Sequence, residues 1–316
     1  MGNKLIVTAA PHITGPDTTQ KIMQRVCIAL LPTLIASILI FGINSLILTV
    51  ITVAACMFFE WGYCKLVGRE VPVGDFSAAV TGVLLAFNLP ATLPWWMAIV
   101  GAFIAIVIVK QLFGGLGYNV ANPAIVARIA LAMGFASRMA NYPHPANGID
   151  ALASATPLAV SGDLGAANYV TLLLGNHGGV LGETCAITLL LGGIYLIATK
   201  VISPVIPVTY LATVAVLSAV SGHDPIVQLL SGGLMLGAFF MATDYVTSPT
   251  TNKGKLVFGI GLGIITCAIR FLGTMNEGVS FAILLMNLLV PYIEILTRQD
   301  RLGIAKAKAK KEGAAK

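Results

Sequence analysis

The chain has 316 residues, of which 57% are hydrophobic and only 10% are charged, and its formal net charge is +6. A soluble globular domain carries roughly a quarter charged residues, and a soluble fold this poor in charge would expose large apolar patches. The composition therefore excludes an ordinary soluble protein and indicates an integral membrane protein, whose outer surface lipid can solvate.

Two long runs near the N-terminus contain no Asp, Glu, Lys or Arg, namely Val26–Phe59 and Phe76–Val109. Each run is too long for a single helical crossing of a hydrocarbon core of roughly 30 Å. The turn-forming stretches Gly42–Ser45 and Pro90–Pro94 interrupt the two runs. Each run is therefore predicted to form a helical hairpin.

A fifth apolar segment covers about Asn122–Phe135, and a polar stretch over 136–183 follows it. Five more apolar segments come next: Thr184–Ala198, Ser203–Val220, Ile226–Thr243, Leu256–Ile269 and Gly278–Ile293. The pattern predicts an all-α integral membrane protein with about ten transmembrane helices, arranged as two five-helix halves.

The distribution of charge predicts the topology. If ten helices alternate in direction, most of the 19 Lys and Arg residues fall on one side, which the positive-inside rule makes cytoplasmic. We expect residues 1–20 and the basic tail 298–316 in the cytoplasm, five-helix halves over 21–135 and 184–297, and an external loop over 136–183 of an inner (cytoplasmic) membrane protein. The tail is interpreted as a solvated end that fixes topology, with membrane lipid as an alternative partner. Nucleic acid is not a predicted partner, because the chain has no basic face rich in aromatic residues.

The two halves resemble each other weakly, since Thr81–Ala86 matches Gly232–Gly237 in pattern. With five helices per half the second copy is inverted, a plan that places functional sites near a pseudo-two-fold axis. Chance similarity among apolar segments is the alternative. The third and eighth segments end in polar turns that contain proline, Asn88–Pro94 and Asp244–Pro249, which is typical of a site inside a membrane.

Little in the chain favours metal or nucleotide chemistry. None of the five cysteines forms a C-x-x-C pair, so no zinc or iron–sulfur site is expected from this chain alone. No G-x-G-x-x-G fingerprint opens a βαβ unit, so pyridine nucleotide is expected to bind elsewhere. No residue is predicted to be catalytic or to bind a metal.

The outer loop contains the segment Asp150–Leu158. Thr156 offers a hydroxyl on an accessible loop, and Pro157 biases it toward an extended conformation. An enzyme arriving from outside could modify such a hydroxyl. From spacing alone, an ordinary Ser/Thr/Pro turn is the favoured interpretation.

Two further candidates are charged. Arg128 lies within the fifth apolar segment, where a charge is expensive and normally faces a partner or a cavity. Asp244 follows Thr243 at the end of the eighth segment and could bind a cation. Helix capping or a salt bridge with Lys253 or Lys255 is the favoured alternative for Asp244. The remaining acidic residues at segment ends are interpreted as marking the membrane surface: Glu60, Asp75 and Glu294.

Three of these stretches carry a family resemblance: Gly114–Ala124, Asp150–Leu158 and Phe239–Asp244. With the ten-helix plan they resemble the D subunit of Rnf complexes, which are ferredoxin:NAD oxidoreductases that pump ions. They are also similar to the longer B subunit of sodium-translocating NADH:quinone reductases. The resemblance covers essentially the whole chain.

In that family a threonine in a D-x-x-(S/T)-G-A-T pattern carries FMN through a phosphoester. The resemblance therefore implies covalent FMN on Thr156, attached by a flavin transferase, with Asp150, Ala155 and Pro157 matching the pattern. Ser154 replaces the usual glycine, and an alanine replaces the Ser/Thr before it.

The resemblance also allows a second, non-covalent flavin. Asn119 and Asn122 can hydrogen-bond a flavin edge or the end of a broken helix, and capping by Asn122 with Pro123 at the first helical position is an equally favoured interpretation. Arg128 could pair with a flavin phosphate or with an acidic neighbour, and the resemblance adds Asp244 to the candidates.

The implied function is that of a membrane subunit of an ion-translocating electron-transport complex. It would pass electrons between subunits on the ferredoxin side and subunits on the NAD side, and this electron transfer would be coupled to Na⁺ or H⁺ translocation. These partner subunits would include both membrane-bound and soluble proteins. The alternative is a stand-alone inverted-repeat transporter or channel without flavin, which fits the helix plan equally well. The Asp150–Leu158 segment separates the two, because a transporter needs no flavin acceptor.

Overall fold

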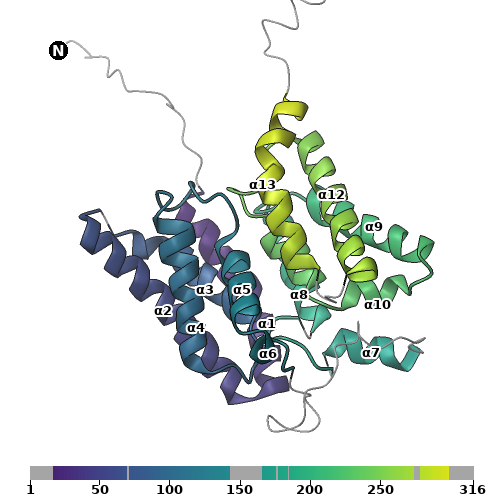
Figure 1. The fold of residues 1–316 in the computed structure, drawn as a ribbon, viewed down its shortest axis with the longest axis horizontal. Coiled ribbons are helices and arrows are strands. Elements are labelled where there is room, and N and C mark those ends of the chain that lie inside the picture. Colours follow the sequence, from purple (N-terminus) through teal and green to yellow (C-terminus); the bar gives the residue numbers. More distant parts are fainter. Residues whose placement is uncertain are drawn as a thin grey trace, which may run out of the picture.

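The structure is a computed structural model that describes residues 17–69, 71–142, 166–175, 177–183, 185–273 and 278–298. The regular elements in these ranges are all helical (Figure 1). They are α1 (Thr19–Phe41), α2 (Ile43–Val67), η1 (Pro72–Asp75), α3 (Ser77–Phe87), α4 (Trp95–Phe103) continued by the π-helical η2 (Ile104–Gln111), α5 (Pro123–Gly134), α6 (Ala136–Met139), α7 (Ala166–Leu174), α8 (Ala186–Ala198), α9 (Val205–Val220), α10 (Pro225–Leu230), α11 (Leu234–Leu236) continued by the π-helical η5 (Gly237–Met241), α12 (Asn252–Leu272) and α13 (Val279–Thr297).

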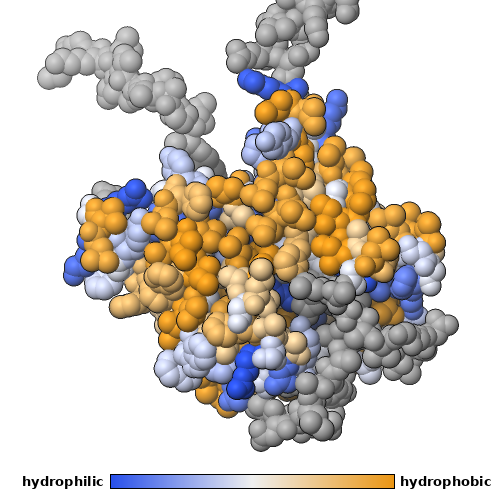
Figure 2. All heavy atoms as spheres, in the orientation of Figure 1, coloured by the Kyte–Doolittle hydropathy of each residue, from blue (hydrophilic) through white to orange (hydrophobic). Residues whose placement is uncertain are grey.

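Four helices, α1, α2, α12 and α13, are long and apolar enough to cross a membrane. On the face shown in Figure 2, apolar residues form a broad area across the middle of the helical body. Large side chains such as Leu39 and Leu296 are more than four-fifths exposed, and lipid solvates such side chains whereas water does not. The predicted all-helical, multi-pass membrane fold is therefore confirmed. The count of ten helices and the inverted repeat stay predictions.

The first two predicted breaks are present in the structure. α1 begins at the Thr18 cap, whose hydroxyl accepts from the Lys21 backbone N–H at 3.3 Å. It ends at Gly42, where a φ of +77° lets the chain reverse directly into α2. In the second run α3 ends before Asn88 and α4 begins after Pro94, so the proline-containing turn separates the two helices.

The predicted apolar segment Ile226–Thr243 is divided into separate helices in the structure. α10 ends before Ser231, and α11 begins after Gly233, whose φ of +68° favours glycine. A helix break leaves backbone carbonyls without intrahelical partners. Arg270 of α12 compensates, because it donates to the carbonyl oxygens of Gln228 at 2.6 Å and Ser231 at 2.9 Å.

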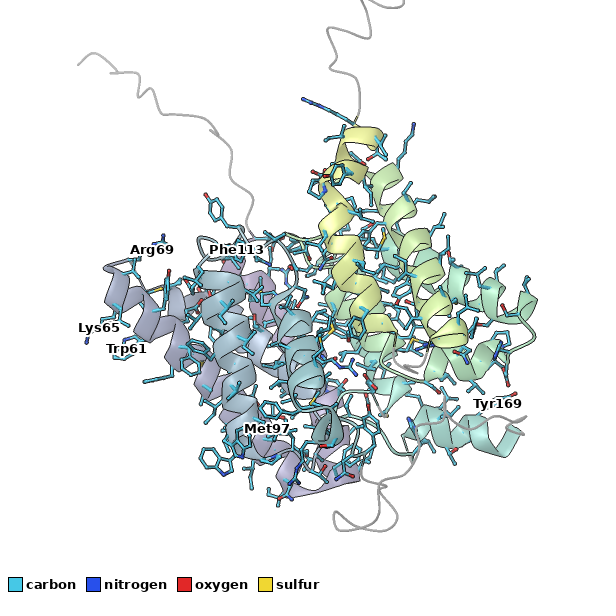
Figure 3. The ribbon with its side chains drawn as sticks, in the orientation of Figure 1. Trp61, Lys65, Arg69, Met97, Phe113 and Tyr169 are labelled. Atoms are coloured by element: carbon cyan, nitrogen blue, oxygen red, sulfur yellow. The ribbon has the colours of Figure 1, made fainter. Side chains whose placement is uncertain are left out.

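The start of α1 and the end of α13 lie on the same side of the helical body (Figure 1). Lys65 and Arg69, at the far end of α2, lie toward that side (Figure 3). This arrangement agrees with an even number of crossings, while the cytoplasmic identity of that side remains a prediction.

The stretch 136–183 contains two short helices, α6 and α7, which the sequence did not predict. Tyr169 of α7 donates a hydrogen bond to Asp224, the residue that caps α10. This contact attaches α7 to the second half of the chain, near the lower edge of the body in Figure 3.

Candidate functional site

A cavity lies between the first and second halves of the chain. It encloses about 790 Å³ free of protein atoms, including its open mouth. Its walls come from α1, α3, the end of η2, the start of α5, the end of α8, and η5 with the loop that follows it. Its polar lining consists of Ser77, Thr81, Lys110, Asn119, Asn122, Thr243 and Asp244. Four of the predicted site residues, Asn119, Asn122, Thr243 and Asp244, therefore meet at one place.

Asn122 caps α5, as one of its two interpretations predicted. Its Oδ1 accepts from the Ala124 backbone N–H at 3.0 Å, and Pro123 occupies the first helical position. Its Nδ2 donates to the carbonyl oxygen of Met241, 3.3 Å away at the end of η5. One side chain thus begins a helix of the first half and contacts the second half at the cavity wall.

Asp244 lies in the loop between η5 and α12. Its carboxylate accepts from the Thr247 hydroxyl at 3.1 Å and from the Asn119 side chain. Burial raises the pKa of the Asp244 carboxyl, and these hydrogen bonds oppose the shift. No ion pair joins Asp244 to Lys253 or Lys255 in the part of the chain that the structure describes, so the salt-bridge interpretation is wrong. Local hydrogen bonds hold the carboxylate instead.

The hydroxyl of Thr243 donates to the carbonyl oxygen of Phe239 at 2.7 Å. Its hydrogen is therefore used within its own helical turn, and the oxygen stays available to accept on the cavity side. Phe239 and Phe240 form part of the apolar wall beside it.

Arg128 does not line the cavity. It is buried, and its guanidinium donates to Asn88 Oδ1 at 3.1 Å and to Ser280 Oγ at 2.8 Å. It also forms an ion pair with Glu183 at 3.4 Å. Of its two predicted partners, a flavin phosphate and an acidic neighbour, the structure thus shows the acidic neighbour. The Arg128 guanidinium also links α5 to the end of α3 and to the start of α13.

A second buried charge cluster adjoins the cavity, and sequence reasoning missed it. Lys110 Nζ lies 2.7 Å from Glu60 Oε1 and 2.6 Å from Ser77 Oγ, and Gln111 donates to the same Glu60 oxygen at 2.9 Å. Glu60 is 0% exposed and Lys110 is 2% exposed. The Ser77 hydroxyl donates in turn to Asp75 at 2.6 Å, so its lone pairs face the lysine.

The interpretation that Glu60 lies at the end of its segment is wrong, because α2 continues for two further turns, to Val67, and the carboxylate is buried. The available signal was position: Glu60 is the sole charged residue between Arg25 and Lys65. A lone carboxylate in such a run must face the protein interior and a partner. The identity of that partner, fifty residues away, was not visible in the local pattern.

The predicted attachment segment lies outside the described residues. Its members are Asp150, Ser154, Ala155, Thr156 and Pro157. Covalent attachment of FMN to Thr156 therefore remains a prediction from the sequence.

Comparison with known proteins supplies the identity of the family. A family model described as the NQR2, RnfD, RnfE family matches residues 6–303. The chain is 46% identical to the D subunit of the Na⁺-translocating ferredoxin:NAD⁺ oxidoreductase complex of Acetobacterium woodii, over 96% of this chain and 97% of that protein. It is 38% identical to the D subunit of the proton-translocating ferredoxin:NAD⁺ oxidoreductase complex of Clostridium ljungdahlii, over 95% and 97% of the two chains. It is also 38% identical to the D subunit of the ion-translocating oxidoreductase complex of Stutzerimonas stutzeri, over 91% and 93%. The chain belongs to the NQR2, RnfD, RnfE family.

Proposed function

We propose that this chain is one of the membrane subunits of an ion-translocating ferredoxin:NAD oxidoreductase complex. In that role it passes electrons between the ferredoxin and NAD side subunits, and this transfer is coupled to Na⁺ or H⁺ translocation across the membrane. The similarity to relatives of that name over almost the whole of both chains supports the proposal. Because one relative is named for Na⁺ and the other for protons, the proposal includes both ions. Its partners are the other membrane and soluble subunits of the complex.

The proposal includes FMN held by a phosphoester to Thr156, attached by a flavin transferase. The match of Asp150, Ala155 and Pro157 to the family pattern supports it. A phosphoester holds the tail of the cofactor and leaves the ring free to take up electrons, while the protein sets its position and potential.

The experiment that tests this assignment is mass spectrometry of the peptide that spans Asp150–Leu158, taken from the natively purified complex. We expect the peptide mass to include one FMN phosphoester, and fragmentation to place it on Thr156. The same chain made in a host without flavin transferase should give the unmodified mass. An unmodified peptide from the native complex would contradict the proposal.

The cavity fits a second, non-covalent flavin by the chemistry of its lining. A flavin ring has an apolar dimethylbenzene end and a pyrimidine edge that accepts and donates hydrogen bonds. Phe239 and Phe240 supply an apolar wall, and the amides of Asn119 and Asn122 lie on the polar side with Lys110. A mostly apolar pocket with a few convergent polar groups is typical of a cofactor site. A flavin there would supply one- or two-electron transfer, while these residues bind and orient it and exclude water.

Filling the cavity tests this second site. Thr81→Phe places a ring in the cavity wall, whereas Val83→Phe adds the same bulk to α3 at a position that does not line the cavity. We expect acid denaturation of the purified complex to release one flavin fewer per complex from Thr81→Phe than from wild type. Val83→Phe should release the wild-type amount, and flavin bound covalently should be unchanged in both. Equal release from Thr81→Phe and wild type would exclude a flavin in this cavity.

A further inference from the structure

Lys110 belongs to two features at once. It is the only cationic side chain among the described residues that line the cavity. Its Nζ also forms the 2.7 Å ion pair with Glu60, which does not line the cavity. The positive member of the pair therefore faces the cavity, and the negative member lies behind it.

The pair is fixed in this orientation. Lys110 is held on two sides, by Glu60 Oε1 and by the Ser77 hydroxyl, whose hydrogen is directed to Asp75. Gln111, the next residue in η2, donates to the same Glu60 oxygen. The lysine charge consequently has little freedom to move away from the cavity wall.

The two charges do not cancel inside the cavity. Their effect on a bound group falls with distance, and both side chains are almost wholly removed from solvent, so screening is weak. Because the lysine lies closer to the cavity, the pair produces a net positive potential there. The negative charge of Glu60 reduces that potential without abolishing it.

The pair is also poorly explained as a device for stability. Glu60 Oε2 is buried and has no hydrogen-bond partner among the described residues. Buried ion pairs that are incompletely hydrogen-bonded are commonly no more stabilising than apolar residues of similar volume. A charged pair in a membrane-embedded site points to function rather than packing.

We propose that Lys110 and Glu60 together set the reduction potential of the flavin bound in the cavity. A flavin ring that takes up two electrons and one proton gains one negative charge, and here the electrons come from the ferredoxin side of the complex. Lys110 favours that charged form, and Glu60 limits the effect. Both residues therefore act on the flavin through the electrostatic potential that they produce in the cavity. This inference rests on the proposed second flavin.

The test is specific because two variants should shift the midpoint potential of the flavin in opposite directions. Glu60→Gln removes the distant negative charge and leaves the lysine, so the midpoint potential of the non-covalent flavin should rise. Glu60→Gln with Lys110→Met removes both charges and leaves no buried ion alone, so the potential should fall below that of wild type. Each change should alter the ratio of reduced to oxidised flavin at fixed potential about tenfold, or about 30 mV for a two-electron couple.

The measurement is a spectroelectrochemical titration of the purified complex, in which Thr156→Ala simplifies the flavin signal. Asp224→Asn, at the start of α10 and outside the cavity lining, is the control for loss of a carboxylate and should leave the potential unchanged. Two results overturn this inference alone, provided that the flavin is bound. The first is a midpoint potential that moves in the same direction in both variants. The second is a ratio of reduced to oxidised flavin that changes less than twofold. Absence of the non-covalent flavin from the wild-type complex overturns the proposed second site itself. If the double variant does not assemble, a rise in Glu60→Gln supports the inference and a fall overturns it.

Discussion

Thr156→Ala is expected to abolish the flavin fluorescence that stays with this chain on a denaturing gel. Alanine has no hydroxyl, so no phosphoester can form. The fluorescence of the band should therefore fall to the background of a lane without this protein. The measurement is in-gel fluorescence under ultraviolet light, normalised to the amount of chain by immunoblot. The electron transfer supported by the complex should be lost to a similar degree if this flavin lies on the electron path.

Two neighbouring variants make the result specific. Thr156→Ser retains a hydroxyl at the same position and should retain part of the fluorescence, while Ser154→Ala removes the other hydroxyl of the segment and should retain nearly all of it. A fluorescent band of full intensity in Thr156→Ala would show that the flavin is attached elsewhere. Loss in Ser154→Ala with retention in Thr156→Ala would move the attachment to Ser154.

Lys110→Met is expected to destabilise the folded protein by about 3–5 kcal/mol, because it leaves a buried carboxylate without its counter-ion. One oxygen of Glu60 already lacks a hydrogen-bond partner among the described residues, so little can replace the lysine. Replacing both partners, as Lys110→Met with Glu60→Leu, should recover most of the loss, since the pair is then exchanged for apolar contacts. The measurement is the free energy of unfolding in mixed micelles with increasing denaturing detergent.

The exposed ion pair between Arg25 of α1 and Asp17, which precedes the helix, is the matched control. Arg25 and Asp17 lie 3.0 Å apart, but their side chains are 32% and 50% exposed. Arg25→Met should therefore cost less than about 1 kcal/mol. Equal losses in Lys110→Met and Arg25→Met, or a double variant as unstable as Lys110→Met, would show that the buried pair does not behave as a coupled charge pair.

Much of the helical framework could be predicted from the sequence. Long runs without charge require helices in lipid, because only internal hydrogen bonding satisfies the backbone there. Gly42 and the prolines at 90 and 94 interrupt such runs locally, so the first hairpin and the break after α3 were visible in advance. The break at Gly233 was not, because a glycine pair in an apolar segment is compatible with a continuous helix. Its stability depends on Arg270 from a distant helix.

The candidate site was likewise predictable in part from the sequence. Asn119, Asn122, Thr243 and Asp244 were individually conspicuous as polar residues beside apolar segments, and the capping role of Asn122 followed from the proline after it. Their convergence on one cavity required the packing of α3 against α5 and the contact of Asn122 with Met241 at the end of η5.

By itself, the sequence determined that this chain is a membrane protein and where most of its helices begin and end, since those properties depend on local composition. Only the tertiary structure decided that Glu60 pairs with Lys110 and that Arg128 pairs with Glu183. Both pairs join residues more than forty positions apart in the chain. Local periodicity shows that a buried charge needs a partner, and helix packing alone selects which partner it meets.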